Sequence, residues 1–378
     1  MIKIILYCDH WQNGGVEAYL MNQLRHWDLS QIKCIILTAE KTTDRYDQEL
    51  QRMNVRQHVL LQGECSSPIL RILRTFRSFR HFLAEHACDI LYLNLTNSVT
   101  MRYAQIAKYI GISRRIVHSH AAGIQPGKTR TMKLMAHKWA KMRYADAATD
   151  WWACSDRAAS FMFLTQNLSQ VVYIPNAIAT DRFKFCEKQR TQLRQQIFGD
   201  EAAVKIVGTI GRCSAEKNQV FLLDVFAAVY RHRTDVRLLL VGDGPMRVFL
   251  EERAKEQGII DVCVFYGFTN DVAPFYSAMD VFCLPSVAEG FGIVALEAQA
   301  AGCICLLSDV VPQKVNVLSQ TRRLPLEASL WEKEMLSALH EQAIGKDRLQ
   351  ASSEIKNAGF DIAENAAAVQ KMLTDVRI

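Results

Sequence analysis

The chain has 378 residues, 49% of them hydrophobic and 22% charged, which is the composition of a globular protein. Its length exceeds that of a usual single core, so we expect two domains. No apolar run approaches the ~20 residues that span a bilayer, and the start MIKIILYCDH lacks a cleavage-like region, so we interpret it as a first strand. The eleven cysteines form no CxxC pair, which argues against zinc and redox sites and favours a cytosolic protein with reduced thiols.

The net charge of +6 is unevenly distributed along the chain. Residues 1–175 contain 22 Lys and Arg against 13 Asp and Glu, a net charge of +9, whereas the remainder has a net charge of −3. We therefore expect the first half to be the part that meets an anionic surface.

Strand-like runs alternate with helical stretches in the first half, which predicts a parallel sheet with crossover helices. Gly14-Gly15 separates the first strand from a helix over Val16–His26. A doubly wound fold places ligands at this turn, although a tight turn explains the glycine pair about as well. The expected strands are Lys3–Tyr7, Lys33–Leu37, Gln57–Leu61, Asp89–Leu93, Arg115–His118 and Trp151–Cys154.

Two helical stretches of this half, Ile69–Leu83 and Lys128–Arg143, are basic and contain no acidic residue. Such helices either lie on an anionic membrane or form a solvated face over a core. Because both occur in the half with excess positive charge, we favour membrane contact. In the first helix the basic residues are Arg71, Arg74, Arg77 and Arg80, and the expected apolar face is Leu70, Leu73, Phe76, Phe79 and either Phe82 or Leu83; in the second the basic residues are Lys128, Arg130, Lys133, Lys138, Lys141 and Arg143.

His118 and His120 stand at the end of a strand, before the small residues Ala121 to Gly123. A histidine beyond the carboxyl end of a strand faces the crevice of a doubly wound fold, although a lone histidine is more often structural. We expect the two side chains to alternate, so that only one faces the crevice. We favour His120, which is nearer the loop.

A domain junction is expected at Pro175, where a short strand ends and polar sequence follows up to Asp200. A second alternating series then begins. Arg212 and Lys217 lie between its first strand and a helix that starts at Gln219, which is a good place to clamp phosphates. The turn VGDGP lacks the full GxGxxG pattern, so a nicotinamide dinucleotide site is not supported. The expected elements are strands Lys205–Ile210, Val236–Val241 and Val262–Tyr266 and helices Leu330–Gln342 and Ile362–Val376.

The stretch from Asp280 to Ser308 places a helix between two apolar strands. Two glycines, at 290 and 292, precede the helix and let backbone N–H groups approach an anion at its start. Glu297 follows Glu289 about two turns later, so both carboxylates can face one crevice. This arrangement suits a ligand with hydroxyls at both ends and a diphosphate between them, and a buried unit with two solvated glutamates is equally compatible with the spacing.

Taken together, the motifs resemble the retaining glycosyltransferases of family 4. The resemblance implies an α/β protein of the GT-B fold, with two Rossmann-like domains facing each other across a cleft. It implies an acceptor-binding domain over 1–175, rejoined by a C-terminal helix at about 360–378, and a nucleotide-sugar-binding domain over 176–359. The segments that carry it are GGVE (14–17), HSH (118–120), IPNAI (174–178), GRCSAEKN (211–218), VGDGP (241–245), YGF (266–268) and PSVAEGFGIVALEAQAAG (285–302), the last being similar to the EX7E motif.

The resemblance also implies roles for individual residues. Arg212 and Lys217 would neutralise the donor diphosphate, together with backbone groups of Phe291, Gly292 and Ile293. Glu297 would bind the ribose diol and Glu289 the donor sugar. The base would stack near Gly267 and Phe268, Gly15 would let the first loop close over the donor, and His120 would contact the sugar at the reacting carbon.

The implied reaction retains the anomeric configuration on one face of the sugar and uses no divalent metal or other cofactor. The resembling subgroup makes bacterial capsules and exopolysaccharides, which implies a nucleotide-sugar donor, with uridine as the base, and a polyprenyl-linked glycan acceptor. We expect a cytoplasmic protein that is peripheral on the inner face of an anionic membrane. Its acceptor surface would carry Arg71, Arg74, Arg77, Arg80, Lys133, Lys138 and Lys141.

One feature departs from the family pattern, because Ser308 to Gln313 stands where many relatives have a Gly-Gly-Pro-Glu turn. Two alternatives stay open: a nucleotide-sugar epimerase of the same fold, and a catalytically silent membrane-associated scaffold. The intact residues Arg212, Lys217, Glu289 and Glu297 argue against the scaffold. Nucleic-acid binding is disfavoured, because the aromatic residues of the basic half occupy core-face positions and form no stacking platform.

Overall fold

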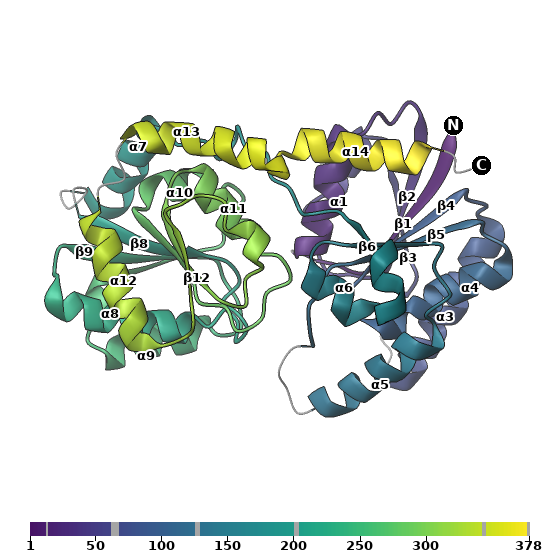
Figure 1. Ribbon diagram of the computed structural model, residues 1–378, viewed down its shortest axis with the longest axis horizontal. Helices are drawn as coiled ribbons and strands as arrows, with labels where there is room; N and C mark the ends of the chain where they lie inside the picture. The colour runs from purple at the N-terminus through teal and green to yellow at the C-terminus, as the bar shows by residue number, and fades with distance from the viewer. Residues whose placement is uncertain (13, 62–67, 125–128, 200–203, 342–344, 376–378) are drawn as a thin grey trace. The chain divides into compact units, whose positions relative to one another are not determined.

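A computed structural model describes residues 1–12, 14–61, 68–124, 129–199, 204–341 and 345–375 (Figure 1). The chain forms two compact units. Unit 1 comprises Met1–Asn176 and Ile362–Ile378, and unit 2 comprises Ala177–Asp361. Each unit is an α/β layer structure around its own parallel sheet, as the alternation of strands and helices predicted.

Unit 1 contains a seven-stranded parallel sheet in the order β3-β2-β1-β4-β5-β6-β7. The chain starts in the middle of the sheet, runs to one edge and then returns past β1 to the other. The order therefore reverses between β1 and β4, and ligands of doubly wound folds bind at the carboxyl ends of such strands. The strands are β1 (Ile2–Trp11), β2 (Ile32–Lys41), β3 (Arg56–Val59), β4 (Ile90–Leu95), β5 (Arg114–Ser119), β6 (Asp150–Ala153) and β7 (Val172–Tyr173).

Helices cover both faces of this sheet (Figure 1). Ile4 and Leu6 of β1 face one layer, where the first and last helices lie side by side and Gln23 donates a hydrogen bond to Asn365 at 2.9 Å. Tyr7 faces the opposite layer and packs on Phe79 at 5.4 Å between ring centroids. The helices are α1 (Gly15–His26), α2 (Asp47–Arg52), α3 (Pro68–Glu85), α4 (Arg102–Ile110), α5 (Arg130–Arg143), α6 (Asp156–Met162) and α14 (Ile362–Thr374), with short 3-10 turns η1 (Ser98–Met101) and η2 (Thr165–Gln170).

Unit 2 repeats the same design with a six-stranded parallel sheet in the order β10-β9-β8-β11-β12-β13. Here the strand order reverses between β8 and β11. The edge strand β13 was not predicted from the sequence, because its Thr-Arg-Arg-Leu run has little apolar content. The strands are β8 (Lys205–Ile210), β9 (Val236–Val241), β10 (Cys263–Gly267), β11 (Val281–Leu284), β12 (Ile304–Ser308) and β13 (Thr321–Leu324).

The core of unit 2 lies between its sheet and helices on each face (Figure 1). One face packs on the fully buried side chains of Leu222, Leu250 and Trp331, which come from α8, α9 and α12. The opposite face is covered by α7, α10, α11 and α13. The helices are α7 (Glu187–Phe198), α8 (Gln219–His232), α9 (Arg247–Glu256), α10 (Ala273–Ala278), α11 (Ile293–Ala300), α12 (Ala328–His340) and α13 (Gly345–Ile355), followed by a π-turn over Lys356–Phe360.

Helix α7 lies in the polar sequence up to Asp200, in which no helix was predicted. Arg194 on this helix is only 7% exposed, and its Nη2 donates to Asp280 Oδ2 at 2.5 Å. Arg190, one turn earlier, donates to Asp280 Oδ1 at 2.6 Å. Charged residues therefore fix this helix to unit 2, which hydrophobic periodicity could not predict.

Candidate donor site and acceptor face

The loop between β8 and α8 carries two of the predicted cationic residues at the reversal point of the unit 2 sheet. Arg212 is exposed, and its guanidinium has no partner among the described residues. The turn after β9 presses against this loop. A Cβ at Gly242 would lie 2.1 Å from the Gly211 carbonyl oxygen, and one at Gly244 would lie 2.5 Å from the Cys213 carbonyl oxygen. Only glycine permits this close approach, so the VGDGP turn positions the cationic loop.

Lys217 and Glu289 form an ion pair of 2.6 Å between Nζ and Oε2. The Ser286 hydroxyl donates to the same carboxylate oxygen at 3.3 Å. The two loops are also joined by their backbones, because the Val287 N–H donates to the Glu216 carbonyl at 2.9 Å. The structure thus brings together two residues that are distant in sequence and that the motifs had assigned to one ligand.

The start of α11 lies immediately after this pair. Gly292 has a φ of 91°, in the left-handed region that favours glycine, and precedes Ile293, the first helical residue. Phe291 is buried and anchors the turn. The Ala295 N–H donates to the Gly292 carbonyl at 2.9 Å. The first amides of a helix have no carbonyl partner four residues earlier in the helix, which is why helix starts favour anions.

Glu297 lies further along α11, where its side chain is partly buried. The Tyr276 hydroxyl donates to its Oε2 at 2.7 Å. Burial raises the pKa of Glu297 to about 7, against the lowering effect of this hydrogen bond and of the charge of Arg182. The carboxylate therefore exchanges a proton near neutral pH, and Oε1 stays available to a ligand hydroxyl.

Gly267 and Phe268, the predicted base-stacking residues, follow β10. Gly267 has a φ of 85°, and the Phe268 side chain is 54% exposed. The adjacent Tyr266 ring packs on Phe275 in an edge-to-face contact of 4.5 Å between centroids. Phe268 thus places an aromatic ring beside a left-handed glycine at the carboxyl end of β10, where the motifs predict that a base stacks.

His118 and His120 lie on the same side of β5, with ring centroids 4.0 Å apart. The expectation that they alternate was wrong, because side chains two residues apart on a strand share a face. His118 is fully buried, and burial lowers its pKa. His120 stands at the strand end, where its Nε2–H donates to Asn94 Oδ1 at 2.9 Å. Burial lowers the pKa of His120 to about 3, so the ring is neutral and Nδ1 is an acceptor.

The other predicted residue at this edge of unit 1 is Gly15, which begins α1 after β1. A Cβ at Gly15 would meet no atom within 4 Å, whereas one at Gly14 would lie 2.6 Å from Glu17 Oε2. Glu17 turns back to accept from the Gln12 N–H at 2.9 Å. The local packing thus restricts Gly14 more than Gly15, and the predicted loop closure at Gly15 stays a prediction.

Helix α3 differs from the expected amphipathic pattern in its first half. Phe76, Phe79, Phe82 and Leu83 are buried as predicted, but Leu70 and Leu73 are 53% and 50% exposed. Among its arginines, Arg71 forms an ion pair with Glu40, whereas Arg74, Arg77 and Arg80 are exposed.

Helix α5 exposes an apolar stripe. Met132, Met135, Trp139 and Met142 recur at spacings of three and four residues and are 57–66% exposed. The helix packs instead through His137 and Ala140 on its other side. Lys133 and Lys138 are exposed, while the partly buried Lys141 donates to the Ser160 carbonyl at 2.6 Å. Lys128 lies outside the described residues.

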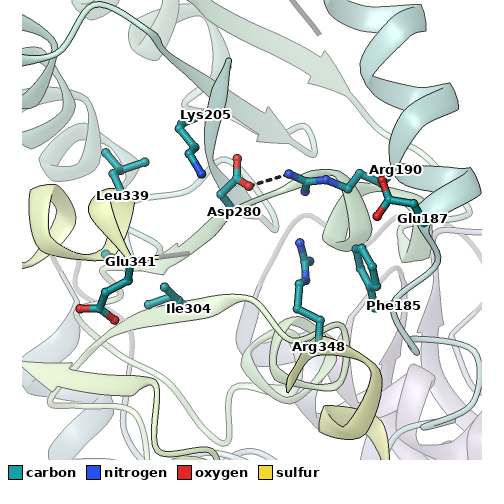
Figure 2. A pocket seen from close by; sticks show the side chains of 10 residues that line it. Phe185, Glu187, Arg190, Lys205, Asp280, Ile304, Leu339, Glu341 and Arg348 are labelled. Carbon is teal, nitrogen blue, oxygen red and sulfur yellow. Dashed lines mark hydrogen bonds and ion pairs between the residues drawn. The ribbon is translucent and has the colours of Figure 1, made fainter. Parts of the chain in front are cut away.

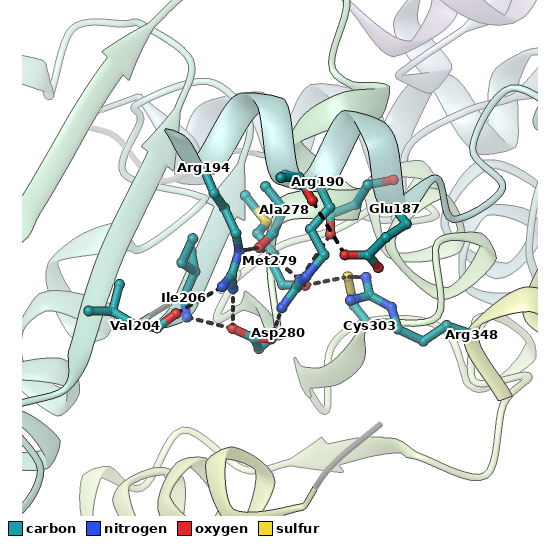
Figure 3. A network of polar contacts seen from close by, with 12 residues as sticks. Glu187, Arg190, Arg194, Val204, Ile206, Ala278, Met279, Asp280, Cys303 and Arg348 are labelled. Atoms are coloured by element: carbon teal, nitrogen blue, oxygen red, sulfur yellow. Dashed lines mark hydrogen bonds and ion pairs between the residues drawn. The ribbon is translucent and has the colours of Figure 1, made fainter. Parts of the chain in front are cut away.

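A second pocket of unit 2 lies at the amino ends of the strands, away from the candidate donor site. Figure 2 shows Lys205 and Ile304, which begin β8 and β12, on its wall beside Arg190, Asp280 and Arg348; its volume is about 310 Å³. Figure 3 shows why these charges are structural: Asp280 accepts from both arginines of α7 and from the Ile206 N–H at 2.8 Å. Arg348 is likewise bound, donating to the Ala301 and Tyr276 carbonyls.

Three residues to which the sequence analysis gave no role form hydrogen bonds with predicted site residues. Ser286 and Tyr276 bind the two glutamates, and Asn94 binds His120. Asn94 is the penultimate residue of β4 and pairs with His118 of β5. Its place at the end of a strand beside the reversal point of the sheet was the signal that could have identified it. Tyr276 offered none, because its ring is indistinguishable in sequence from a core residue.

Within the described ranges, no group of three His, Cys, Asp or Glu side chains is placed to hold a metal ion. No helix in this part of the chain is both long enough and apolar enough to cross a membrane.

Residues 191–329 match the family model described as glycosyl transferases group 1. Among curated proteins, EpsF of Bacillus subtilis, which is named as a glycosyltransferase, is 28% identical over 97% of this chain and 95% of its own length. The UDP-Gal:alpha-D-GlcNAc-diphosphoundecaprenol alpha-1,3-galactosyltransferase of Escherichia coli is 23% identical over 64% of this chain and 63% of its own length.

Among solved structures, HepE of Anabaena in complex with UDP and glucose superposes with a TM-score of 0.80 at 18% identity. The alignment covers all of both chains. This likeness confirms the GT-B fold of two Rossmann-like domains that the sequence predicted.

Proposed function

We propose that this chain, a GT-B glycosyltransferase whose residues 191–329 form a glycosyl transferases group 1 domain, moves a sugar from a nucleoside diphosphate to a glycan with retention of configuration. The observation that carries the proposal is the pair of Lys217 and Glu289 at the start of α11. It joins a phosphate-binding cation and a hydroxyl-binding carboxylate beside a helix start that favours anions.

The protein contacts the diphosphate, the ribose, the sugar and the base of the donor. Lys217 and Arg212 attract the phosphates. When the diphosphate replaces Glu289 as the partner of Lys217, the Glu289 carboxylate becomes free to accept hydrogen bonds from the sugar hydroxyls. As the sugar–phosphate bond breaks, negative charge develops on the leaving diphosphate, where these cations and the amides at the start of α11 stabilise it. Glu297 binds the ribose diol, and Phe268 stacks on the base.

Neutral His120 contributes a hydrogen bond and not a proton at physiological pH. Its Nδ1 accepts from a hydroxyl of the sugar while Asn94 fixes the ring orientation. The leaving phosphate helps take the proton of the acceptor, so no side chain need act as general base and no divalent metal is required.

We infer that the donor base is uridine and that the acceptor is lipid-linked. The Anabaena structure contains UDP, and the name of the Escherichia coli relative gives a UDP-sugar and a diphosphoundecaprenol acceptor. Such an acceptor lies in a membrane and belongs to the synthesis of cell-surface polysaccharides.

We infer that unit 1 is the acceptor-binding unit and lies on the inner face of an anionic membrane. On α5 the exposed stripe of Met132, Met135, Trp139 and Met142 is accompanied by Lys133 and Lys138, with no acidic residue in the helix. An apolar stripe beside basic residues is the pattern of helices that insert into the interface of anionic lipids.

The test is a calorimetric screen of nucleotide-sugars, followed by measurement of transfer with the best binder. Lys217→Ala removes a charge-assisted contact of about 1.5–3 kcal/mol, so UDP affinity should fall about tenfold or more. Lys255→Ala on exposed α9 is the matched control and should leave affinity unchanged. Equal affinities for the wild type and Lys217→Ala would refute the donor site.

A further inference from the structure

Unit 1 contains a pocket between its edge strand β3 and helix α3, lined by two of the arginines that the sequence analysis expected at the acceptor surface. The cavity has a volume of about 460 Å³. Arg74, Arg77 and His81 line it from α3, and His58 lines it from β3. Residues 74, 77 and 81 follow the three- and four-residue spacing of one helix face, so the two guanidinium groups and the imidazole converge on one side of the cavity.

The two arginines of this β3–α3 pocket are available to a ligand. Both Arg74 and Arg77 are exposed, and neither has a hydrogen bond or ion pair within the described ranges. Arg71, one turn earlier on α3, is already bound to Glu40. The acid on the pocket wall is Glu85, and its carboxylate lies 3.3 Å from His81 Nε2. The pocket therefore presents unpaired positive charge, which favours a multiply charged anion.

The inner wall of the same pocket is apolar. Phe82 is 4% exposed, and its ring lies between those of His58 and His86, with centroids 4.6 and 4.1 Å away. Leu60 and Leu61 continue this wall at the end of β3. Outside the pocket on α3, Ile72 and Leu73 remain about half exposed. A cationic rim around an apolar wall matches an amphiphile whose phosphate is attached directly to a hydrocarbon chain.

We propose that the β3–α3 pocket binds the diphosphate of an isoprenoid lipid, with Arg74 and Arg77 on the phosphate oxygens and the first isoprene units against Phe82 and Leu60. This inference rests on the proposed lipid-linked acceptor and assigns a site to its anchor. All strands of the sheet are parallel, so the end of β3 lies at the same edge as Gly15 and His120. From β3 to β5 there are four strand spacings, about 19 Å, so the pocket holds an end of the acceptor remote from His120.

The experiment measures binding of farnesyl diphosphate, a soluble isoprenoid diphosphate, to the full chain by titration calorimetry. Arg74→Gln and Arg77→Gln combined should weaken this binding about tenfold or more, because charge-assisted contacts to both phosphates are lost. Arg80→Gln is the control: it removes one positive charge from the same helix, against two in the double variant, but Arg80 does not line the pocket. It should change affinity less than about twofold, as expected for an exposed charge.

Each comparison decides one part of the proposal. Equal losses in Arg80→Gln and in the double variant would show diffuse attraction and no pocket. If inorganic diphosphate binds as tightly as farnesyl diphosphate, the isoprenoid chain contributes nothing and the pocket is not a lipid site. If farnesol binds as tightly as farnesyl diphosphate, the phosphates contribute nothing and the arginines do not bind them. UDP affinity should be unchanged in the double variant, which also reports that the chain is folded.

The outcome is distinguishable from failure of the proposed function. If the chain binds farnesyl diphosphate through the two arginines but transfers no sugar, the proposed pocket is supported and the proposed transferase activity is refuted. Sugar transfer to a lipid-linked acceptor that is insensitive to both arginine substitutions would refute the pocket alone.

Discussion

Among individual residues, Glu297 gives the clearest prediction for how donor binding depends on pH. Its carboxyl is half protonated near pH 7 in the free chain, and a ribose diol binds the ionised form better because both hydroxyls can then donate. Raising the pH from 6 to 8 should therefore strengthen binding, with release of a proton on binding at the lower pH.

The measurement uses calorimetry with an intact nucleotide-sugar, whose diester phosphates do not titrate in this range. Glu297→Gln should weaken binding and abolish the pH dependence, whereas Glu289→Gln should spare free UDP and reduce binding or turnover of the sugar-bearing donor. An unchanged pH profile in Glu297→Gln would contradict the assignment.

At the scale of elements, helix α7 is attached to unit 2 by ionic contacts. Burial alone raises the pKa of Asp280, but the charges of Arg190 and Arg194 outweigh it and hold the pKa below its ordinary value. The stabilisation is therefore present at neutral pH and is lost as the pH falls through the native pKa of this carboxyl.

Asp280→Asn should destabilise unit 2 by about 3 kcal/mol, because it leaves two partly buried guanidinium groups without their counter-charge. Urea unfolding followed at pH 7 measures the loss. The control is Asp235→Asn, which breaks an exposed pair with Arg233 and should cost less than about 1 kcal/mol. If the two variants unfold alike, the buried network does not hold α7.

Helix α5 carries the second prediction at this scale. Replacing Met135 and Trp139 by serine removes two side chains that would insert among lipids, each contributing roughly 1.5–3 kcal/mol. Sedimentation with anionic vesicles should show a loss of binding of about tenfold or more. Phe249→Ser, which replaces a half-exposed apolar residue of unit 2, is the control and should bind as the wild type does.

For the whole molecule, the charge asymmetry coincides with the division into units. The residues of unit 1 include 24 Lys and Arg against 15 Asp and Glu, whereas unit 2 has 21 against 24. Each basic residue near an anionic surface contributes on the order of 1 kcal/mol, screened within a Debye length.

Binding to anionic vesicles should accordingly weaken as salt is raised from about 0.05 to 0.5 M, while neutral vesicles bind weakly throughout. Light scattering or sedimentation over this range measures it. A wild-type chain that does not bind anionic vesicles at low salt would refute the peripheral location and would indicate a soluble acceptor.

The sequence by itself determined the two parallel sheets, because buried strands such as Val281–Leu284 are continuous apolar runs between turn residues. It also singled out Arg212, Lys217 and Glu289 as candidate residues, since they lie in short local motifs at strand ends; their role in donor binding stays a prediction. These features depend on local composition and spacing, which the linear order retains.

Only the tertiary structure decided which side chains meet. The Lys217–Glu289 pair, the Tyr276–Glu297 hydrogen bond and the seating of α7 on Asp280 each join residues at least 21 positions apart. The exposed stripe of α5 and the open cationic pocket beside β3 have the same origin: apolar or basic periodicity shows that a helix is amphipathic, but only the packed neighbours determine which face is covered.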